Sequence, residues 1–247
     1  MQADFMNQPP DQLNLNIKLD DSVSLDKFIK CDSNRNSLEF LKSTLIEDSV
    51  SNLFYLWGLE GVGKSYLMQA LHREFINRDM KTLHLSFDDN RITSPDIFKN
   101  LGTLEVILIE KIDQLPQETD WEIALFSLIN EALSSKTKIY LSSNLVSKDL
   151  KIELMDLKSR LSYFTAIEIP EITDEEKKEA LSQSSKRKGI HLDEKTIDYI
   201  VSHTSRSLSN LLKLINELDI YSLKKKRKVT PSLVRELLQT KSDSLHR

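Results

Sequence analysis

Short apolar runs alternate with helical patterns through the first two thirds of the chain. The run Leu53–Trp57 is apolar and aromatic, and the segment after it places Leu67, Leu71 and Phe75 on one face of a helix. Strands that alternate with helices form parallel sheets, in which both faces of each strand are covered. The pattern therefore predicts an α/β fold with a five-stranded parallel sheet, its strands at residues 53–57, 82–86, 104–109, 138–142 and 166–169.

Only helical patterns remain after Pro170. Thr173 and Glu176 have the spacing of a capping box, in which two side chains satisfy main-chain N–H groups at the start of a helix. Further helices are expected from about residues 193, 207 and 230 onward. We therefore expect a flexible N-terminal segment at residues 1–22, an α/β base at residues 23–170 and a helical lid at residues 171–247.

Glycine is concentrated in the turn between the first strand and its helix. Residues 58–65 read Gly-Leu-Glu-Gly-Val-Gly-Lys-Ser and hold three of the five glycines of the chain. This is the spacing of a phosphate-binding loop, in which consecutive N–H groups and a helix N-terminus face an anion. A flexible turn can match the spacing by coincidence, but the strand before it and the helix after it favour binding.

In such a loop each residue type has its own role. Lys64 would reach the outer phosphates of a nucleotide, and the hydroxyl of Ser65 would bind Mg²⁺. The residues expected to contact the nucleotide here are Gly58, Glu60, Gly61, Val62, Gly63, Lys64, Ser65 and Tyr66.

Composition narrows the class of protein. The chain has 247 residues, of which 39% are hydrophobic, and a net charge of −4, which disfavours a surface built generally for nucleic acid. No apolar run is long enough to span a bilayer, and the N-terminus lacks the regions of a secretory signal, so we expect a cytoplasmic protein without membrane contact. The single Cys31 excludes an internal disulfide and gives no metal-binding cluster.

The combined pattern resembles the AAA+ nucleotide-binding proteins of the bacterial initiator branch, the DnaA/Hda family. The resemblance covers nearly the whole chain, from residues 12–17 to residues 231–238. It implies an AAA+ base and lid that hold ADP or ATP with Mg²⁺ between them, and subunits that meet across the nucleotide, so that a homo-oligomer is compatible with it. Which of the two nucleotides gives the working form is left open.

The resemblance also implies partners. Hda-type members of this family are tethered to the DNA sliding clamp and stimulate ATP hydrolysis by the initiator DnaA. DnaA and the clamp are therefore the expected partners, in the bacterial cytoplasm and associated with the nucleoid through the clamp. The chain ends before a helix-turn-helix domain of the DnaA type would fit, so DNA contact is expected to be indirect or weak.

Two arginines match family positions. Arg160 corresponds to the arginine finger, which crosses a subunit interface to reach the γ-phosphate of the neighbour; a guanidinium suits this role because it is planar and permanently charged. Arg206 corresponds to the lid arginine that contacts phosphates in cis. The alternatives are an ordinary surface arginine on a helix for Arg160 and one at a helix start for Arg206.

The end of the third strand departs from the pattern of an active ATPase. The family has two acidic residues here, one that organises Mg²⁺ and one that activates water, whereas this chain has Glu110 and Lys111. Glu110 can keep the metal role, but Lys111 carries only donors at neutral pH and cannot act as the base. Asp113 lies two residues further on and would need a different approach. Asn144 occupies the polar sensor position after the fourth strand, so we predict nucleotide binding with weak or absent turnover.

The N-terminal segment resembles a sliding-clamp-binding peptide. In residues 12–17, Gln12 would bind at the edge of the clamp pocket, and spaced aliphatic side chains, namely Leu13, Leu15 and Ile17, would enter an apolar groove. The alternative is an edge strand of the protein itself, because the same aliphatic residues alternate. Further along, residues 23–29 resemble the linker that lines the adenine pocket.

Three functions remain open on the sequence alone. The first is a regulator that acts in trans through Arg160, the second an AAA+ ATPase acting as a helicase loader or DnaA-like initiation factor, and the third a truncated initiator that forms filaments on DNA. Lys111 favours the first, because a protein whose arginine acts on a partner needs no catalytic base of its own. The basic run at residues 224–229 reads as a solvated helix end, with DNA contact as the lesser alternative.

Overall fold

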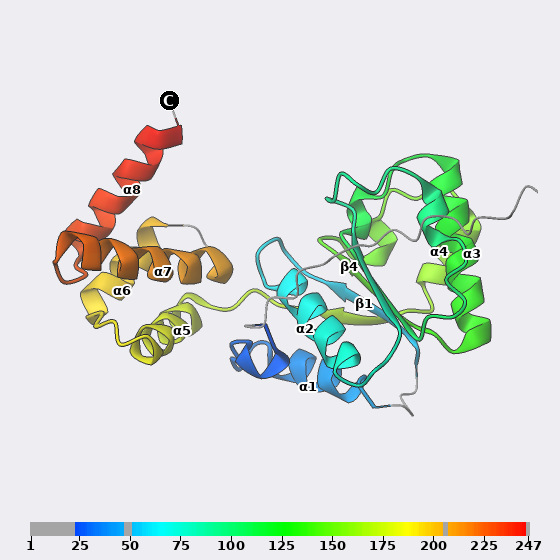
Figure 1. The fold of residues 1–247 in the computed structure, drawn as a ribbon, viewed down its shortest axis with the longest axis horizontal. Helices are drawn as coiled ribbons and strands as arrows, with labels where there is room; N and C mark the ends of the chain where they lie inside the picture. The colour runs from blue at the N-terminus through cyan, green and yellow to red at the C-terminus, as the bar shows by residue number, and fades with distance from the viewer. Residues whose placement is uncertain (1–22, 47–50, 205–206, 246–247) are drawn as a thin grey trace, which may run out of the picture.

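The computed structural model describes residues 23–46, 51–204 and 207–245. Within these residues, five parallel strands form one sheet in the order β2-β3-β4-β1-β5 (Figure 1). β1 pairs with both β4 and β5, so the strand that leads into the glycine-rich turn is internal. The predicted α/β fold is confirmed, with small shifts at strand ends, and the bounds are β1 (Leu53–Trp57), β2 (Thr82–Ser86), β3 (Val106–Glu110), β4 (Lys138–Ser143) and β5 (Thr165–Glu168).

Helices cover both faces of the sheet, as the continuous apolar strands require. They are α1 (Arg35–Ser43), α2 (Lys64–Ile76), α3 (Thr119–Ser135) and α4 (Met155–Leu161), joined in places by the 3-10 helices η1 (Leu25–Lys27), η2 (Pro95–Phe98), η3 (Ile112–Gln114) and η4 (Ser147–Asp149). Val106 and Leu108 of β3 share a hydrophobic cluster with α1 and α2. Ile107 and Ile109 share the other cluster with α3 and α4. Successive residues of one strand thus fill two separate cores.

The lid has a hydrophobic core of its own, to one side of the base (Figure 1). Its first helix begins with the predicted capping box, because the Thr173 hydroxyl accepts from the N–H of Glu176 at 3.2 Å and the Glu176 carboxylate accepts from the N–H of Thr173 at 2.8 Å. The same carboxylate accepts two hydrogen bonds from Ser33 and so joins lid to base. The helices of the lid are α5 (Asp174–Arg187), α6 (Glu194–His203), α7 (Leu208–Lys225) and α8 (Pro231–Leu245).

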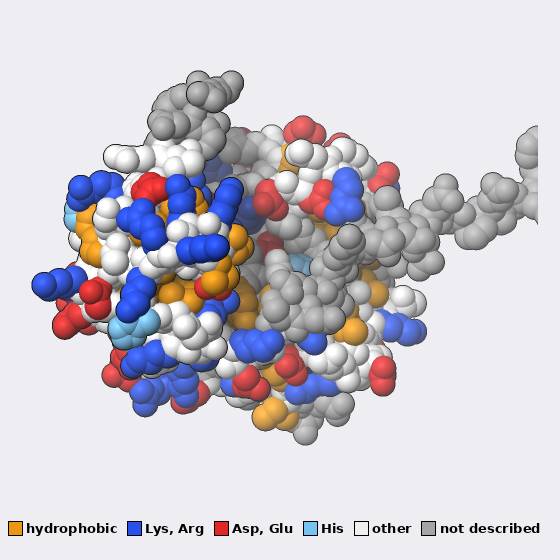
Figure 2. Space-filling model, turned by 60° about the vertical axis from the view of Figure 1, so that its left-hand side comes forward, with side chains coloured by type: hydrophobic (Ala, Val, Ile, Leu, Met, Phe, Trp, Pro, Cys, Tyr) orange, Lys and Arg blue, Asp and Glu red, His pale blue; other side chains and the backbone are white. Residues whose placement is uncertain are grey.

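The net charge of the lid differs in sign from that of the rest of the chain. Residues 171–247 contain 16 Lys and Arg and 12 Asp and Glu, a net charge of +4, whereas the rest of the chain carries −8. Figure 2 shows Lys and Arg side chains gathered on the lid. At the end of α7, Lys225 and Arg227 both pair with Glu236 of α8, so this basic run helps to join two helices. None of the described helices has the length and apolar character needed to cross a membrane.

Candidate functional site

The turn between β1 and α2 holds the residues predicted to form a phosphate-binding loop. Gly61 and Gly63 have φ angles of 83° and 105°, in the left-handed region that favours glycine. A Cβ on Gly61 would lie 2.4 Å from the Ser207 hydroxyl oxygen, and a Cβ on Gly63 would lie 2.7 Å from the ring of Phe28. The loop therefore fits closely between the lid and the N-terminal linker, residues 23–29, and no side chain can replace either glycine without movement.

Lys64 folds back onto this loop. Its Nζ donates hydrogen bonds to three oxygens, the carbonyls of Gly58 at 2.7 Å and Leu59 at 2.8 Å and the side-chain amide oxygen of Asn144 at 2.9 Å. Only 8% of the residue's surface is exposed. The ammonium thus lies at the junction of the loop and the end of β4, where a P-loop lysine meets the outer phosphates of a nucleotide.

Carboxylates surround this ammonium. Burial lowers the pKa of Lys64, while the negative charges of Asp113, Glu60 and Glu110 act to raise it. A cation beside carboxylates at the N-terminus of a helix fits the outer end of a polyphosphate chain that brings its own metal ion.

Asp113 joins the site through Asn144. One carboxylate oxygen of Asp113 accepts from the main-chain N–H of Asn144 at 3.1 Å, and the other accepts from its side-chain Nδ2 at 3.1 Å. Asp113 therefore reaches Lys64 indirectly, through Asn144, the residue at the predicted sensor position. Asp113 is held in place for this by the turn of η3, which follows β3.

Glu110 is buried against a histidine. Its Oε1 lies 2.7 Å from Nε2 of His84 on the neighbouring strand β2, and both residues are less than a tenth exposed. The ring of His72, from α2, packs edge-on against that of His84 with centroids 5.1 Å apart. Burial, and then the neighbouring His84, lower the pKa of His72 to about 4. Sequence reasoning missed both histidines, although His84 lies two residues before the strand partner of Glu110 and so on its side of the sheet.

The side chain of Lys111 lies beside Asp88. The two side chains form an ion pair, and the hydrogen bond from Lys111 is the main reason that the pKa of Asp88 is lowered. Lys111 has a φ of 58°, which turns the chain sharply from β3 into η3. The position after Glu110 thus presents a neutralised cation where an active ATPase has a carboxylate base.

The side chains available for Mg²⁺ are few. Ser65 is exposed near the start of α2, and Glu110 has one carboxylate oxygen engaged with His84. Among the described residues, no three acidic, histidine or cysteine side chains form a metal-binding group. This fits Mg²⁺ held chiefly by phosphate oxygens and water, with one or two protein ligands, which is how the ion usually binds with nucleotides.

The N-terminal linker, residues 23–29, lies against the start of α2. The hydroxyl of Tyr66 accepts from the N–H of Ser24 at 3.3 Å and lies 3.2 Å from the carbonyl oxygen of the same residue. The rings of Phe28 and Tyr66 have centroids 5.7 Å apart. An aromatic surface therefore adjoins the phosphate-binding loop.

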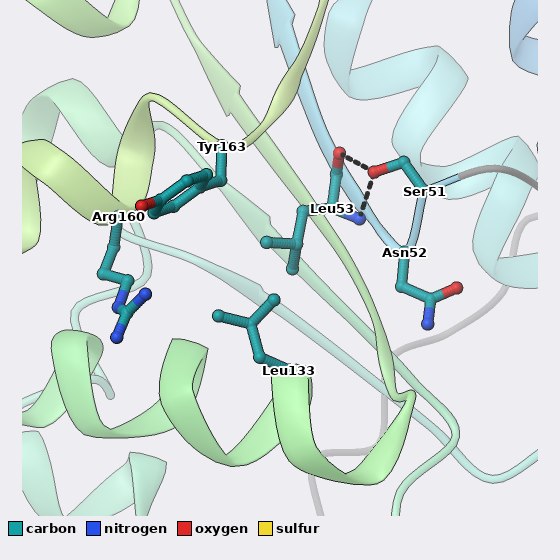
Figure 3. A pocket seen from close by; sticks show the side chains of 6 residues that line it. All are labelled: Ser51, Asn52, Leu53, Leu133, Arg160 and Tyr163. Atoms are coloured by element: carbon teal, nitrogen blue, oxygen red, sulfur yellow. Dashed lines mark hydrogen bonds between the residues drawn. The ribbon is translucent and has the colours of Figure 1, made fainter.

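Arg160 lies at the other end of the sheet. It lines a pocket of about 310 Å³ with Ser51, Asn52 and Leu53, which precede or begin β1, whereas the phosphate-binding loop follows the end of that strand (Figure 3). Five strand residues span about 16 Å. Arg160 is thus separated from the loop of its own chain by the length of the sheet.

Aromatic rings hold the Arg160 side chain. Its Cζ lies 5.9 Å from the ring centroid of Phe126 in α3 and 5.7 Å from that of Tyr163 (Figure 3 shows Tyr163 beside it). None of the described carboxylates forms an ion pair with it. The guanidinium is therefore positioned by contacts with two rings and not by an ion pair with any described residue.

Known proteins share this architecture. A family model described as "Hda, lid domain" matches residues 174–238. Domain III of the Thermotoga maritima replication initiation protein DnaA superposes with a TM-score of 0.77 at 17% identity, over 90% of this chain and 98% of that domain. The chain is an AAA+ protein related to Hda and DnaA. It also belongs to the family described as protein of unknown function DUF815, whose model matches residues 3–144, more than half of the chain.

Two other relatives extend this comparison. The AMPPCP-bound DnaA from Aquifex aeolicus matches with a TM-score of 0.68 at 24% identity, over 81% of this chain and 66% of that one. A protein of Haemophilus influenzae, described only as uncharacterized, is 27% identical over 228 residues, which cover 92% of this chain and 98% of that protein. The structural matches show the shared fold, and the Hda/DnaA-related assignment rests on them together with the lid.

Several predicted site residues of this AAA+ protein lie outside the described residues. They are the clamp-peptide residues Gln12, Leu13, Leu15 and Ile17, and the lid arginine Arg206. Ser207, the residue after Arg206, is described, and its hydroxyl donates to the carbonyl of Gly61 at 3.2 Å. The lid thus contacts the phosphate-binding loop directly at the start of α7.

Proposed function

We propose that this chain is a nucleotide-binding regulator of replication initiation that stimulates ATP hydrolysis by DnaA in trans through Arg160. One observation carries the proposal. The Arg160 guanidinium is held by two aromatic rings and has no carboxylate partner among the described residues. It lies at the opposite end of the strands from its own phosphate-binding loop. An arginine so placed is available to a neighbouring subunit and not to its own nucleotide.

The chemistry proposed for Arg160 is electrostatic. Phosphoryl transfer develops negative charge on the transferred group and the leaving oxygen, and a positioned guanidinium stabilises that charge with several donors at once. Because Arg160 forms no ion pair with another residue that the structure describes, its approach to the γ-phosphate of a partner costs little reorganisation. Removal of such an arginine typically lowers the rate by about 10³- to 10⁵-fold.

The protein's own site is proposed to bind ADP or ATP without appreciable turnover. The amides of residues 61–65 and the Lys64 ammonium would hold the phosphates, with Ser65 and Glu110 as ligands or outer contacts of Mg²⁺, which when bound neutralises phosphate charge. Arg206 would contact the phosphates from the lid. Lys111, paired with Asp88, supplies no base to activate water. Nucleotide would then shape the surface presented to partners.

The tether to the clamp is the third part of the proposal. Gln12, Leu13, Leu15 and Ile17 would bind a sliding clamp on DNA, which raises the local concentration of this protein near DnaA. DNA contact is then indirect, and self-association across the nucleotide remains compatible with the scheme. Deletion of residues 12–17 is expected to remove clamp dependence and to leave nucleotide binding intact. Loss of both functions would favour a strand of the protein's own fold.

The decisive experiment measures DnaA-bound ATP hydrolysis with clamp-loaded DNA and this protein. Arg160→Ala is expected to abolish stimulation, whereas Lys158→Ala, an exposed residue of the same helix α4, retains it. Equal stimulation by the Arg160→Ala protein would refute the arginine finger. Single-turnover hydrolysis by the isolated protein tests the alternative of a true ATPase, because Lys111 predicts almost none.

A further inference from the structure

We infer that the side chain of Asn144, held in place by Asp113, competes with nucleotide phosphate for Lys64, so that these two residues set the nucleotide affinity of the site. The inference rests on the proposed nucleotide binding of the same loop. In this scheme Asp113 orients Asn144, a role that the sequence pattern did not predict. Asn144 opposes nucleotide binding, whereas a sensor residue would assist it.

The first step is the number of protons on Lys64. An ammonium group carries three N–H donors and no acceptor. All three have oxygen partners within 2.9 Å, so the group has no donor left for a phosphate. A phosphate oxygen that binds Lys64 must therefore replace one of these partners.

The second step identifies the partner that is replaced. The carbonyls of Gly58 and Leu59 belong to the turn at residues 58–65 itself and lie six and five residues before Lys64, respectively. The amide oxygen of Asn144 comes from the end of β4 and is the one acceptor on another element. It is also the acceptor on a side chain, which can rotate. Asn144 is thus the partner that yields most readily to a phosphate.

The third step is the hold that Asp113 has on Asn144. Its two carboxylate oxygens accept from the main-chain N–H and the side-chain Nδ2 of Asn144, each at 3.1 Å. This fixes the orientation of the amide, because a flipped amide would place Nδ2 against the Lys64 ammonium and Oδ1 against the carboxylate. Release of Lys64 by rotation of the Asn144 side chain therefore breaks the charge-assisted hydrogen bond from Nδ2 to Asp113.

The charge of Asp113 acts in the same direction. Its negative charge acts to raise the pKa of Lys64, more than the charges of Glu60 and Glu110 do, against the lowering caused by burial. A negative charge beside the ammonium opposes the approach of an anion. An experiment must therefore separate this general charge effect from the specific contact of Asn144.

The test is a titration of the full-length protein with a fluorescent adenosine diphosphate analogue, with Mg²⁺ present. Asn144→Ala removes the competing oxygen without changing the charge of the site. We expect it to tighten binding roughly three- to tenfold, because phosphate then no longer has to displace a hydrogen bond to the Lys64 ammonium. Asp113→Ala is expected to tighten it at least as much. Asp113→Ala in the Asn144→Ala background, where the competing amide is already absent, reports the charge effect alone.

Two results of this titration would overturn the inference. Weaker or unchanged binding by Asn144→Ala would overturn the inference, because the amide would then assist the nucleotide or be indifferent to it. A gain from Asp113→Ala in the parent protein no larger than its gain in the Asn144→Ala background would also overturn it. Thermal unfolding of each variant verifies that it is folded. Failure of the parent protein and all variants to bind the analogue would instead refute the proposed nucleotide site, with Lys64→Ala as the non-binding reference.

Discussion

Nε2 of His84 lies 2.7 Å from Oε1 of Glu110, and both side chains are almost completely buried in the base. A buried carboxylate without a partner is costly, so the pair constrains two neighbouring strands at the edge where the phosphate-binding loop lies. The pair also means that Glu110, the proposed Mg²⁺ ligand, already has a hydrogen bond to a histidine of the protein itself.

The first prediction concerns the strength of this pair. His84→Phe keeps the ring volume but leaves the carboxylate unpaired, and we expect a loss of about 3 kcal/mol in the free energy of unfolding. Glu110→Leu in the same background should recover part of the loss. Urea denaturation of the single and double variants, followed by circular dichroism, measures the coupling. Additive effects within about 0.5 kcal/mol would show that the two groups do not interact.

The second prediction is a pH dependence of stability from His72. Its folded pKa of about 4 lies below the usual 6.5, because burial and then His84 disfavour the charged ring. The fold therefore holds a neutral imidazole. Its contribution is complete above pH 6.5 and is lost as the pH falls toward 4, with a loss of about 2 kcal/mol by pH 5.

Denaturant titrations at pH 7.5 and pH 5 test this. His72→Phe should reduce the difference between the two pH values, since it removes the group that gains a proton on unfolding. His84 of β2 packs against His72 and is itself paired with Glu110 of β3, so the His84→Phe protein serves as the control for the part of this pair in the profile. An unchanged difference in His72→Phe would contradict the assignment.

The third prediction concerns the aromatic hold on Arg160. Tyr163 is 60% exposed, so its removal should leave the core intact while the guanidinium loses one of its two rings. We expect Tyr163→Ala to lower stimulation of DnaA-bound ATP hydrolysis roughly two- to fivefold, in keeping with a cation–π contact at an exposed site. Tyr163→Phe keeps the ring and should retain full stimulation. A loss in both variants would point to the hydroxyl group instead.

The fourth prediction concerns the contact between lid and loop. Gly61→Ala places a Cβ 2.4 Å from the Ser207 hydroxyl oxygen, at a φ of 83° that disfavours any other residue. We expect weaker nucleotide binding and a loss of about 1 to 3 kcal/mol in the free energy of unfolding. Ser207→Gly in the same background removes the steric part and should restore some of each. Calorimetric binding and thermal unfolding measure the two effects.

The local features of this protein could be predicted from its sequence. The order of the strands along the chain, the phosphate-binding loop at residues 58–65 and the capping box of Thr173 and Glu176 follow from periodicity and turn chemistry within a few residues. The replacement of an acidic residue by Lys111 was also visible. These features depend on neighbours along the chain, which a sequence displays directly.

The tertiary structure decided which distant side chains act together. Glu110 meets His84, 26 residues away, Asp113 meets Asn144, 31 residues away, and Ser207 reaches Gly61 across 146 residues. Such contacts depend on strand order, register and the placement of the lid, which no local pattern contains. The same holds for Arg160, whose distance from its own loop follows from the direction of β1 and whose rings come partly from α3. The sequence determines which reactive side chains are present, and the packing of strands, helices and lid determines which of them lie together.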